Sequence, residues 1–538
     1  MQNLQVKRIE KTDIIIAGSL FILGMITRVP FVSRTIFEGD SARFAMAMKG
    51  YDVAQMRPHA PGYILYVAAA KFTDLFLHDT RVSLIGVSLL SSALAVCALY
   101  VLAVQMYGRS NAVINAVLLL TSPLYWFNGE MPFTYALEGF LSVIFALACY
   151  QLLCGKKGWL LISGVALGLV TGVRQHIVIM LFPLWLYAMR RYSWKQVTAS
   201  LLAFGLTCLV WFVPMITLTG GVEKYYAASY AQVHTWVKHP APFLLQIVGR
   251  GKVFAGFMVY SLCFGLLPML YFYMRFFKIP DMAKDPRIKF LLIWLVPPVL
   301  FLIGVNVFNP GHVVVVLPPL FICLAESIKG AAMDLQKAAH KVVPHIASPL
   351  RTSLLSLFSY KVNLVALVIV LVCVNTYIFL FKETRVSYAT IRAGDRHIEE
   401  LVRLTKESAA PQNAMVLTFL YNTQAGFYLP DYLVYCPFPL MFSPSDVPID
   451  AQNVYVTVGY QTNPKTYWIP TGFKIEPIPV PENIEKVILW EEEITRYFRD
   501  SSRPIEEIAS DRSDTKIYFF RVKPGEKIYY DYHYLAVK

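Results

Sequence analysis

Residues 37–40 (FEGD) and 57–63 (RPHAPGY) form a polar stretch directly after the first apolar run of the chain. That run, Ile14 to Pro30, is long enough for a transmembrane helix. Carboxylates, a guanidinium and an imidazole therefore gather at an expected membrane surface, in a chain that is otherwise strongly apolar. A lipid-linked substrate would present its head group at this level, so the stretch is the first place to look for chemistry.

The composition of the chain indicates an integral membrane protein. Of its 538 residues, 56% are hydrophobic and only 16% are charged, against about 25% charged residues in soluble proteins. The net charge of +14 does not indicate nucleic-acid binding, because the basic residues cluster in loops between apolar runs. The eight cysteines show no spacing typical of a zinc site, so we expect no structural metal.

Eleven apolar segments are predicted to be transmembrane helices. They cover residues 13–32, 81–106, 111–128, 133–154, 158–173, 175–189, 196–217, 252–275, 288–307, 311–328 and 362–381. Residues 61–78 contain Lys71, Asp74 and His78, which favours a helix lying at the interface over a full crossing.

The basic loops predict the orientation of these spans. Lys7, Arg8 and Lys11 precede the first span, and the other basic loops alternate with less basic ones. With eleven spans, all basic loops fall on one side, which is then the cytoplasmic side. An even number of spans would break this pattern. We therefore expect a multi-pass protein of the cytoplasmic (inner) membrane, with the first external loop, 33–80, on the extracytoplasmic side.

The sequence divides into two domains near residue 385. Residues 1–384 hold the apolar segments, whereas 385–538 are polar and contain short runs typical of strands. The expected strands are 415–420, 454–458, 486–490 and 516–522, and apolar residues at helical spacing between 398 and 404 predict a helix before them. The orientation of the spans places this small α/β domain outside the cytoplasm.

Several ionisable residues fall on the expected extracytoplasmic side. They are Glu38 and Asp40 after the first span, Glu130 and Glu138 around the start of the fourth, Arg174, and His312. Ionisable groups at membrane depth are costly and usually functional. A carboxylate can act as a general base for an acceptor, and Arg or His can bind the phosphate of a lipid carrier.

These residues also have structural interpretations. Asp40 can cap a helix that begins at Ser41, and Arg57 and His59 can be interfacial anchors. Arg174 can be a snorkelling cation. Glu138 lies eight residues after Glu130, so one helix through both would place the two acids on similar faces, two turns apart.

The chain resembles the GT-C fold glycosyltransferases, the group that includes protein O-mannosyltransferases and the aminoarabinose transferase of lipid A. The resemblance is detailed over roughly residues 10–330. It rests on the acids after the first span, the 57–62 stretch, the acidic segment 130–138, the Gly-x-Arg turn 172–174 and the late loop 309–319. It implies a GT-C-like polytopic α-helical fold with about eleven transmembrane helices and a small C-terminal α/β domain.

The resemblance also implies a function. It implies inverting transfer of a sugar from a polyprenyl-phosphate-linked donor to a glycan, lipid or protein acceptor at the extracytoplasmic face. Asp40 matches the catalytic acid of the family, with Glu38 beside it, and Glu130 or Glu138 is the candidate for a second acid. The candidates for binding the donor phosphate are Arg57, His59, Arg174 and His312.

Three departures from the family pattern leave the sugar and the acceptor open. Glu38-Gly39-Asp40 replaces an adjacent Asp-Glu pair, His59-Ala60-Pro61 replaces a His-Pro-Pro form, and His312 stands where an aromatic residue is frequent. A Glu-x-Asp triplet also binds a divalent cation in the oligosaccharyltransferase branch, so that cofactor stays open although many relatives need none. The alternative function is a transporter or flippase of a lipid-linked glycan, but such carriers usually contain internal repeats and none is evident here.

Overall fold

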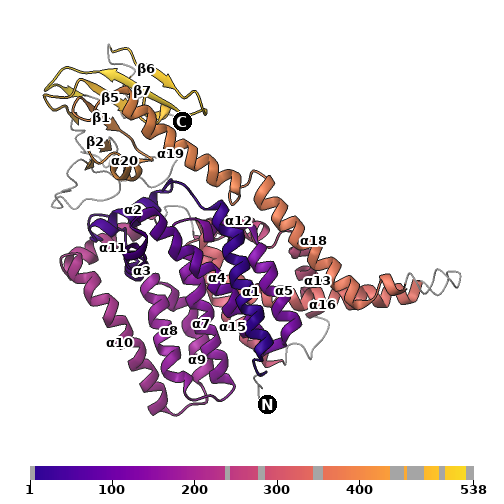
Figure 1. The fold of residues 1–538 in the computed structure, drawn as a ribbon. Coiled ribbons are helices and arrows are strands. Elements are labelled where there is room, and N and C mark those ends of the chain that lie inside the picture. The colour runs from indigo at the N-terminus through magenta and orange to yellow at the C-terminus, as the bar shows by residue number, and fades with distance from the viewer. Residues whose placement is uncertain are drawn as a thin grey trace.

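The structure is a computed structural model that describes residues 7–236, 243–276, 285–342, 355–436, 454–456, 478–495, 498 and 503–528. A bundle of long helices forms the larger part, and a sheet covered by a helix lies at one end of it (Figure 1). The bundle helices are α1 (Lys11–Arg28), α4 (Thr80–Tyr107), α5 (Arg109–Thr121), α6 (Pro123–Glu130), α7 (Tyr135–Leu153), α8 (Trp159–Val173), α9 (Ile177–Met189), α10 (Trp194–Leu218), α12 (Phe243–Leu262), α13 (Leu266–Phe276), α15 (Pro286–Gly304), α16 (Leu317–Val342) and α18 (Tyr360–Phe381).

Eight helices in the described part of the chain are long and apolar enough to cross a membrane, or nine if the bent pair α5–α6 is one span. The short apolar helices α8 and α9 correspond to the other two expected segments. The prediction of one continuous helix over residues 111–128 was wrong, because two helices, α5 and α6, occupy this segment. The chain bends by 62° between α5 and α6, at Ser122 and Pro123, because proline cannot continue the hydrogen-bond ladder of the preceding helix.

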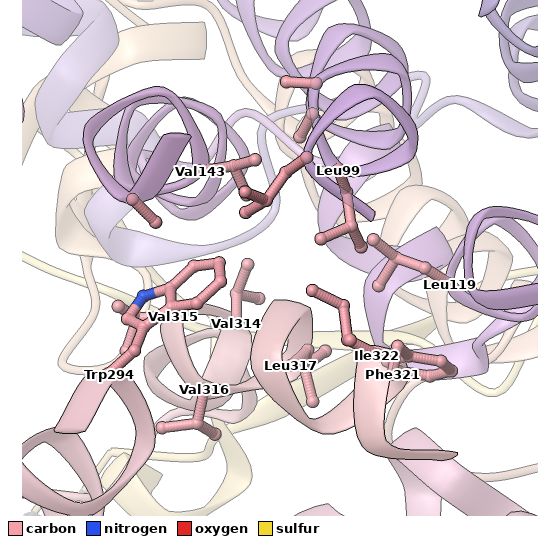
Figure 2. Packing of buried hydrophobic residues seen from close by; sticks show 14 of the residues in the cluster. Leu99, Leu119, Val143, Trp294, Val314, Val315, Val316, Leu317, Phe321 and Ile322 are labelled. Atoms are coloured by element: carbon pink, nitrogen blue, oxygen red, sulfur yellow. The ribbon is translucent and has the colours of Figure 1, made fainter. Parts of the chain in front are cut away.

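The core of the bundle is apolar and draws on segments far apart in the sequence. Figure 2 shows Leu99 of α4, Val143 of α7 and Trp294 of α15 around the 3-10 segment η3 (Pro310–Val316) and the start of α16. Helices α8 and α10 approach closely because Gly164 and Gly168 face α10. A Cβ at Gly164 would lie 2.3 Å from the carbonyl oxygen of Ser200.

Two short helices follow α1, after the 3-10 turn η1 (Val29–Phe31). Helix α2 (Gly39–Lys49) and helix α3 (Ile64–Leu77) pack together over the ends of the bundle helices, and α11 (Val222–Trp236) lies beside them (Figure 1). Helix α3 exposes Phe72, Leu75 and Phe76 while burying Tyr66 and Val67. This one-sided apolar surface suits a helix in contact with lipid, as expected for residues 61–78.

The C-terminal region contains a mixed sheet with strand order β3-β2-β1-β5-β7-β6. Its strands are β1 (Ala414–Leu417), β2 (Leu433–Cys436), β3 (Val454–Val456), β5 (Lys486–Leu489), β6 (Glu506–Ala509) and β7 (Lys516–Arg521). β1 pairs in parallel with β2 and β5, whereas β7 is antiparallel to β5 and β6. The four expected strands are present, but β1, β5 and β7 end one to three residues earlier than expected. Residues 457–458 of the second expected strand lie outside the described part. β2 and β6 were not predicted.

Helix α19 (Tyr388–Ser408) covers one face of this sheet. Its Ile398, Leu401 and Leu404 pack against Val416 and Ile488, while the alternate residues of β1 and β5 enter a second core on the other face. This alternation follows from the two-residue period of strands. The remaining elements are α20 (Asn422–Tyr428), which connects β1 to β2, α21 (Glu492–Thr495), and the pair β4 (Ile478–Pro479) and β8 (Lys527–Ile528).

Candidate functional site

Asp40 lies in the first turn of α2, and its side chain is 44% exposed. The helix begins at Gly39 with Glu38 in the cap position, so the expected start at Ser41 with Asp40 as its cap was wrong. The Oδ1 atom of Asp40 lies 3.6 Å from Nδ1 of His59 and 3.7 Å from Nη1 of Arg43. A carboxylate between an imidazole and a guanidinium therefore stands at the start of the helix, without a capping role.

Arg174 approaches the same place from another element, at the C-terminal end of α8. Its Nη1 lies 3.4 Å from Oε2 of Glu138 in the first turn of α7, and both side chains are buried. The guanidinium carbon lies 4.8 Å from the ring centroid of Tyr135, a distance typical of a cation–π contact. Glu138 and Tyr135 thus fix the guanidinium, and Glu138 compensates its buried charge.

Asp40 and Arg174 line one small cavity. Its other lining residues are Phe44, Tyr63, Phe133, Thr134 and Tyr135. These residues come from α2, the start of α3, the α6–α7 connection and the end of α8, which are brought together by the packing of α2 and α3 onto the bundle. The cavity therefore offers a carboxylate, a guanidinium and aromatic walls to a ligand.

Three buried nitrogen atoms near this cavity have no hydrogen-bond partner among the described residues. They are Nδ1 of His59, Nε of Arg174 and Nδ1 of His312. Nε2 of His59 forms a hydrogen bond with the hydroxyl of Tyr63, at 3.0 Å. The ring of His312 lies edge-on to the ring of Tyr135, with the ring centroids 5.6 Å apart. Buried polar atoms are rarely left unpaired in proteins. Such atoms around a cavity are what a site for a polar ligand requires.

The acids and the histidine at this site titrate differently. Burial alone raises the pKa of Asp40, but His59 and the guanidiniums of Arg43 and Arg174 outweigh it and lower that pKa below its ordinary value. Burial, and then the charge of Asp40, raise the pKa of Glu38 to about 7. Burial lowers the pKa of His59 to about 4. Near neutral pH, Asp40 is therefore ionised and His59 is neutral, so His59 can bind an anion by a hydrogen bond but not by charge.

Of the eight expected site residues, Asp40 and Arg174 line this cavity. Glu38, His59, Glu138 and His312 adjoin its lining residues, whereas Glu130 and Arg57 have other partners. Glu130 is fully buried at the end of α6, where it accepts a hydrogen bond from Nε1 of Trp126 and faces Arg28 of α1. The possibility of one helix through Glu130 and Glu138 was wrong, because α6 ends at Glu130 and α7 begins at Tyr135. Arg57 forms a β-bridge with Asp52 and also lies outside the lining.

Arg43, Tyr63 and Tyr135 lie at the site but were not among the predicted site residues. Arg43 lies three residues after Asp40, so a helix starting at Gly39 places both on one side, and this spacing was a usable signal. The two tyrosines carry no comparable signal, because 32 tyrosines are spread along the chain.

The open question of a divalent cation can be tested against the residues present. Nowhere in the described part of the chain do three or more His, Cys, Asp or Glu side chains form a group that could hold a metal ion. Asp40 has cationic Arg43 beside it instead. These residues do not fit a metal site at Glu38 and Asp40.

Residues 59–217 match the family model described as "Dolichyl-phosphate-mannose-protein mannosyltransferase". Among solved structures, ArnT from Cupriavidus metallidurans in the apo state has a TM-score of 0.58 and 11% identity, covering 95% of this chain and 99% of that chain. The same protein bound to undecaprenyl phosphate gives a TM-score of 0.57 and 12% identity, covering 98% of each chain. The Archaeoglobus fulgidus oligosaccharyltransferase has a TM-score of 0.45 and 12% identity, covering 88% of this chain and 69% of that one. No curated protein sequence matches the chain.

The comparisons confirm the resemblance to GT-C fold glycosyltransferases. The matched family model covers the segment from His59 through α10, which supplies Tyr63, Tyr135, Glu138 and Arg174. The likeness to ArnT extends over almost the whole chain and shows a shared fold, including the C-terminal region. The matched family model describes a mannosyltransferase, which bears out the expected enzyme class of glycosyltransferase.

Proposed function

We propose that the protein transfers a sugar from a polyprenyl-phosphate-linked donor to an acceptor at the extracytoplasmic face of the membrane, with inversion at the anomeric carbon. The observation that carries this proposal is that Asp40 and Arg174 line the same cavity. An ionised carboxylate can accept a proton there while a guanidinium receives a phosphate. The undecaprenyl phosphate bound by ArnT supports a donor of this class, and the distribution of basic loops supports the side.

Asp40 acts as the general base in this mechanism. Its carboxylate takes the proton of the acceptor hydroxyl as that oxygen attacks the anomeric carbon. The bond from this carbon to the phosphate oxygen breaks in the same displacement, so the configuration inverts and no covalent enzyme intermediate forms. The lowered pKa of Asp40 keeps it ionised and available at neutral pH.

Arg174 stabilises the leaving group. The phosphate gains negative charge as the bond to the sugar breaks, and a fixed guanidinium beside it lowers the barrier for that step. Glu138 holds Arg174 at 3.4 Å, so little reorganisation is needed when the charge develops. The unpartnered Nδ1 of His312 and Nε of Arg174 are further donors for phosphate oxygens. The aromatic rings of Tyr63 and Tyr135 provide flat surfaces for the sugar.

The test is covalent transfer by the purified full-length protein in lipid nanodiscs. Donors with different sugars on polyprenyl phosphate are offered with candidate acceptors, and products are identified by mass spectrometry and their anomeric configuration by NMR. We expect one donor to give an inverted product, and Asp40→Asn to lower the rate by about 10²–10⁴-fold. Asp431→Asn, at an exposed site in the C-terminal region, is the matched control and should retain the wild-type rate.

A different outcome would favour the transporter interpretation. Movement of a lipid-linked glycan across the bilayer by the wild-type protein, with no covalent product from any donor, would contradict the proposal. A product that retains the donor configuration would contradict the single displacement.

A further inference from the structure

The chain directly before Glu38 is held by the C-terminal region, not by the bundle alone. Oδ1 of Asp395, on α19, accepts hydrogen bonds from Oγ of Ser33 at 2.8 Å and from Oγ1 of Thr35 at 3.0 Å. It also accepts from the backbone N–H groups of Arg34 and Thr35, both at 2.9 Å. A single carboxylate oxygen thus fixes three consecutive residues that lie more than 350 positions away in the sequence.

Two further side chains of the C-terminal region continue these contacts toward Glu38. The hydroxyl of Tyr428 accepts from the backbone N–H of Ile36 at 2.6 Å, and Nε2 of Gln424 donates to the carbonyl oxygen of Phe37 at 2.7 Å. Every residue from 33 to 37 therefore has a backbone or side-chain hydrogen bond to the C-terminal region. We call Asp395, Gln424 and Tyr428 the clamp.

Packing reinforces the clamp. Gly394 lies so close to Phe37 that an added Cβ would be 2.5 Å from its ring. Arg392 pairs with the second oxygen of Asp395 at 2.7 Å, and Asp395 is only 1% exposed. Helix α20, which carries two clamp residues, lies against α2 (Figure 1). Lys49, at the other end of α2, lies over the ring of Phe427. Both ends of the helix that carries Asp40 are thus tied to the C-terminal region.

We propose that Asp395 is a positioning residue, through which the C-terminal region sets the place of Glu38 and Asp40 over the cavity. Only two residues, Ile36 and Phe37, separate the clamped Thr35 from Glu38, and α2 follows at once. A short segment fixed at each residue cannot shift without breaking buried hydrogen bonds, and an unpaired buried group is costly. The C-terminal region is therefore part of the transfer site, although none of its described residues lines the cavity.

This inference rests on the proposed function, because its readout is the transfer rate. The two fail in different ways. If the wild-type protein transfers no sugar, the proposed function fails. If the wild-type protein is active and the clamp variants are equally active, only the positioning role fails.

The first test uses Thr35, which lies outside the C-terminal region and donates its hydroxyl to the clamp residue Asp395. Thr35→Val removes that hydroxyl at nearly constant volume, and Thr35→Ser keeps it. We expect Thr35→Val to lower kcat several-fold with little change in KM for the donor, and Thr35→Ser to retain the wild-type kcat. Equal kcat values for the two variants would overturn the proposal.

The second test uses Asp395→Asn in the full-length protein. A misplacement of the base by ~1 Å is expected to lower kcat by about 10–100-fold while KM for the donor changes by less than about twofold. Hydrogen exchange of the amides of residues 33–37 should become faster in the same variant. The control is Glu526→Gln, which weakens the pair between Arg503 and Glu526 inside the C-terminal region, away from the clamp. Wild-type kcat and exchange in Asp395→Asn, or an equal loss of kcat in the control, would refute the positioning role. If Asp395→Asn does not fold, the Thr35 pair decides.

Discussion

The sites around Arg174 and around Arg28 in the helix bundle each combine a buried acid with a buried arginine, and they differ in what surrounds these groups. Glu138 and Arg174 form an ion pair beside a cavity that also exposes Asp40. Glu130 and Arg28, both fully buried, face each other without a direct ion pair. Arg28 donates instead to the carbonyl oxygen of Leu120 at 3.1 Å and lies over the rings of Tyr125 and Trp126.

The difference shows that a buried charge near a membrane does not by itself identify a catalytic group. Both acids come from one short segment and are equally unusual by sequence. Only Glu138 belongs to a set of groups that converge on a cavity. Glu130, at the end of α6, faces Arg28 of α1. Its backbone carbonyl oxygen accepts a hydrogen bond from the N–H of Ser33 at 3.2 Å. We therefore propose a structural role for Glu130 and Arg28 and a functional one for Glu138 and Arg174.

The largest expected effect is the loss of activity on substitution of Arg174, compared with substitution of Arg57, which lies outside the cavity lining. Removing the guanidinium that faces the developing phosphate charge, in Arg174→Ala, should lower kcat/KM for the donor by about 10²–10³-fold. Arg57→Ala should change it by less than about threefold, because Arg57 does not line the cavity. Both are measured per folded molecule. A larger loss for Arg57→Ala would reverse the assignment of the donor phosphate.

A smaller loss is expected for Glu138→Gln. The amide keeps the size of the side chain but no longer holds Arg174 by charge, so the guanidinium becomes less well placed. We expect kcat to fall by about tenfold, within the range seen when a catalytic group is misplaced. Thermal unfolding serves as the control for folding. Wild-type kcat in this variant would show that Arg174 is positioned by other contacts, such as its stacking on Tyr135.

Glu130→Gln should affect stability and leave the chemistry unchanged. The amide can still accept from Trp126, but the buried carboxyl group that faces Arg28 is lost, and two nitrogen atoms of Arg28 have no hydrogen-bond partner among the described residues. We expect the free energy of unfolding to fall by about 1–2 kcal/mol. The transfer rate per folded molecule should stay within about twofold of wild type.

The smallest effect concerns pH and Glu38. Its pKa of about 7 in the folded protein lies above the ordinary value of 4.5, so the stability linked to this group is greatest below pH 4.5 and is lost as pH rises through 7. Between pH 5 and 8 the loss should be about 1 kcal/mol, less than full burial would give because the side chain is partly exposed. Glu38→Gln should flatten this part of the profile, measured by thermal unfolding at a series of pH values. Parallel profiles for the two proteins would contradict the assigned pKa.

The membrane part of the fold could be predicted because its apolar segments are long. Each of the eleven corresponds to one helix or to two successive helices, α5–α6 or α12–α13. The bend at Ser122 escaped prediction, although Pro123 was a signal for it. In the C-terminal region, β1, β5 and β7 are rich in apolar residues and were found, but β6 is mostly exposed and polar, and such edge strands have no apolar pattern.

The candidate site was predictable only in part. Asp40 and Arg174 stand out as charges next to apolar runs, and the structure brings them together. Sequence alone did not separate Glu138 from Glu130, because the separation depends on a helix break whose position is set by tertiary packing. The clamp was equally hidden, since Asp395 resembles any acid of an amphipathic helix until its long-range partners are known.

The most direct test of the account compares single-turnover transfer by Asp40→Asn and Glu130→Gln, each normalised to folded protein. Both substitutions replace one carboxylate by an amide of the same size, and only the first lies in the cavity. We predict a rate lower by about 10²–10⁴-fold for Asp40→Asn and a rate within about twofold of wild type for Glu130→Gln. A wild-type rate for Asp40→Asn, or a larger loss for Glu130→Gln, would contradict the assignment of the transfer site.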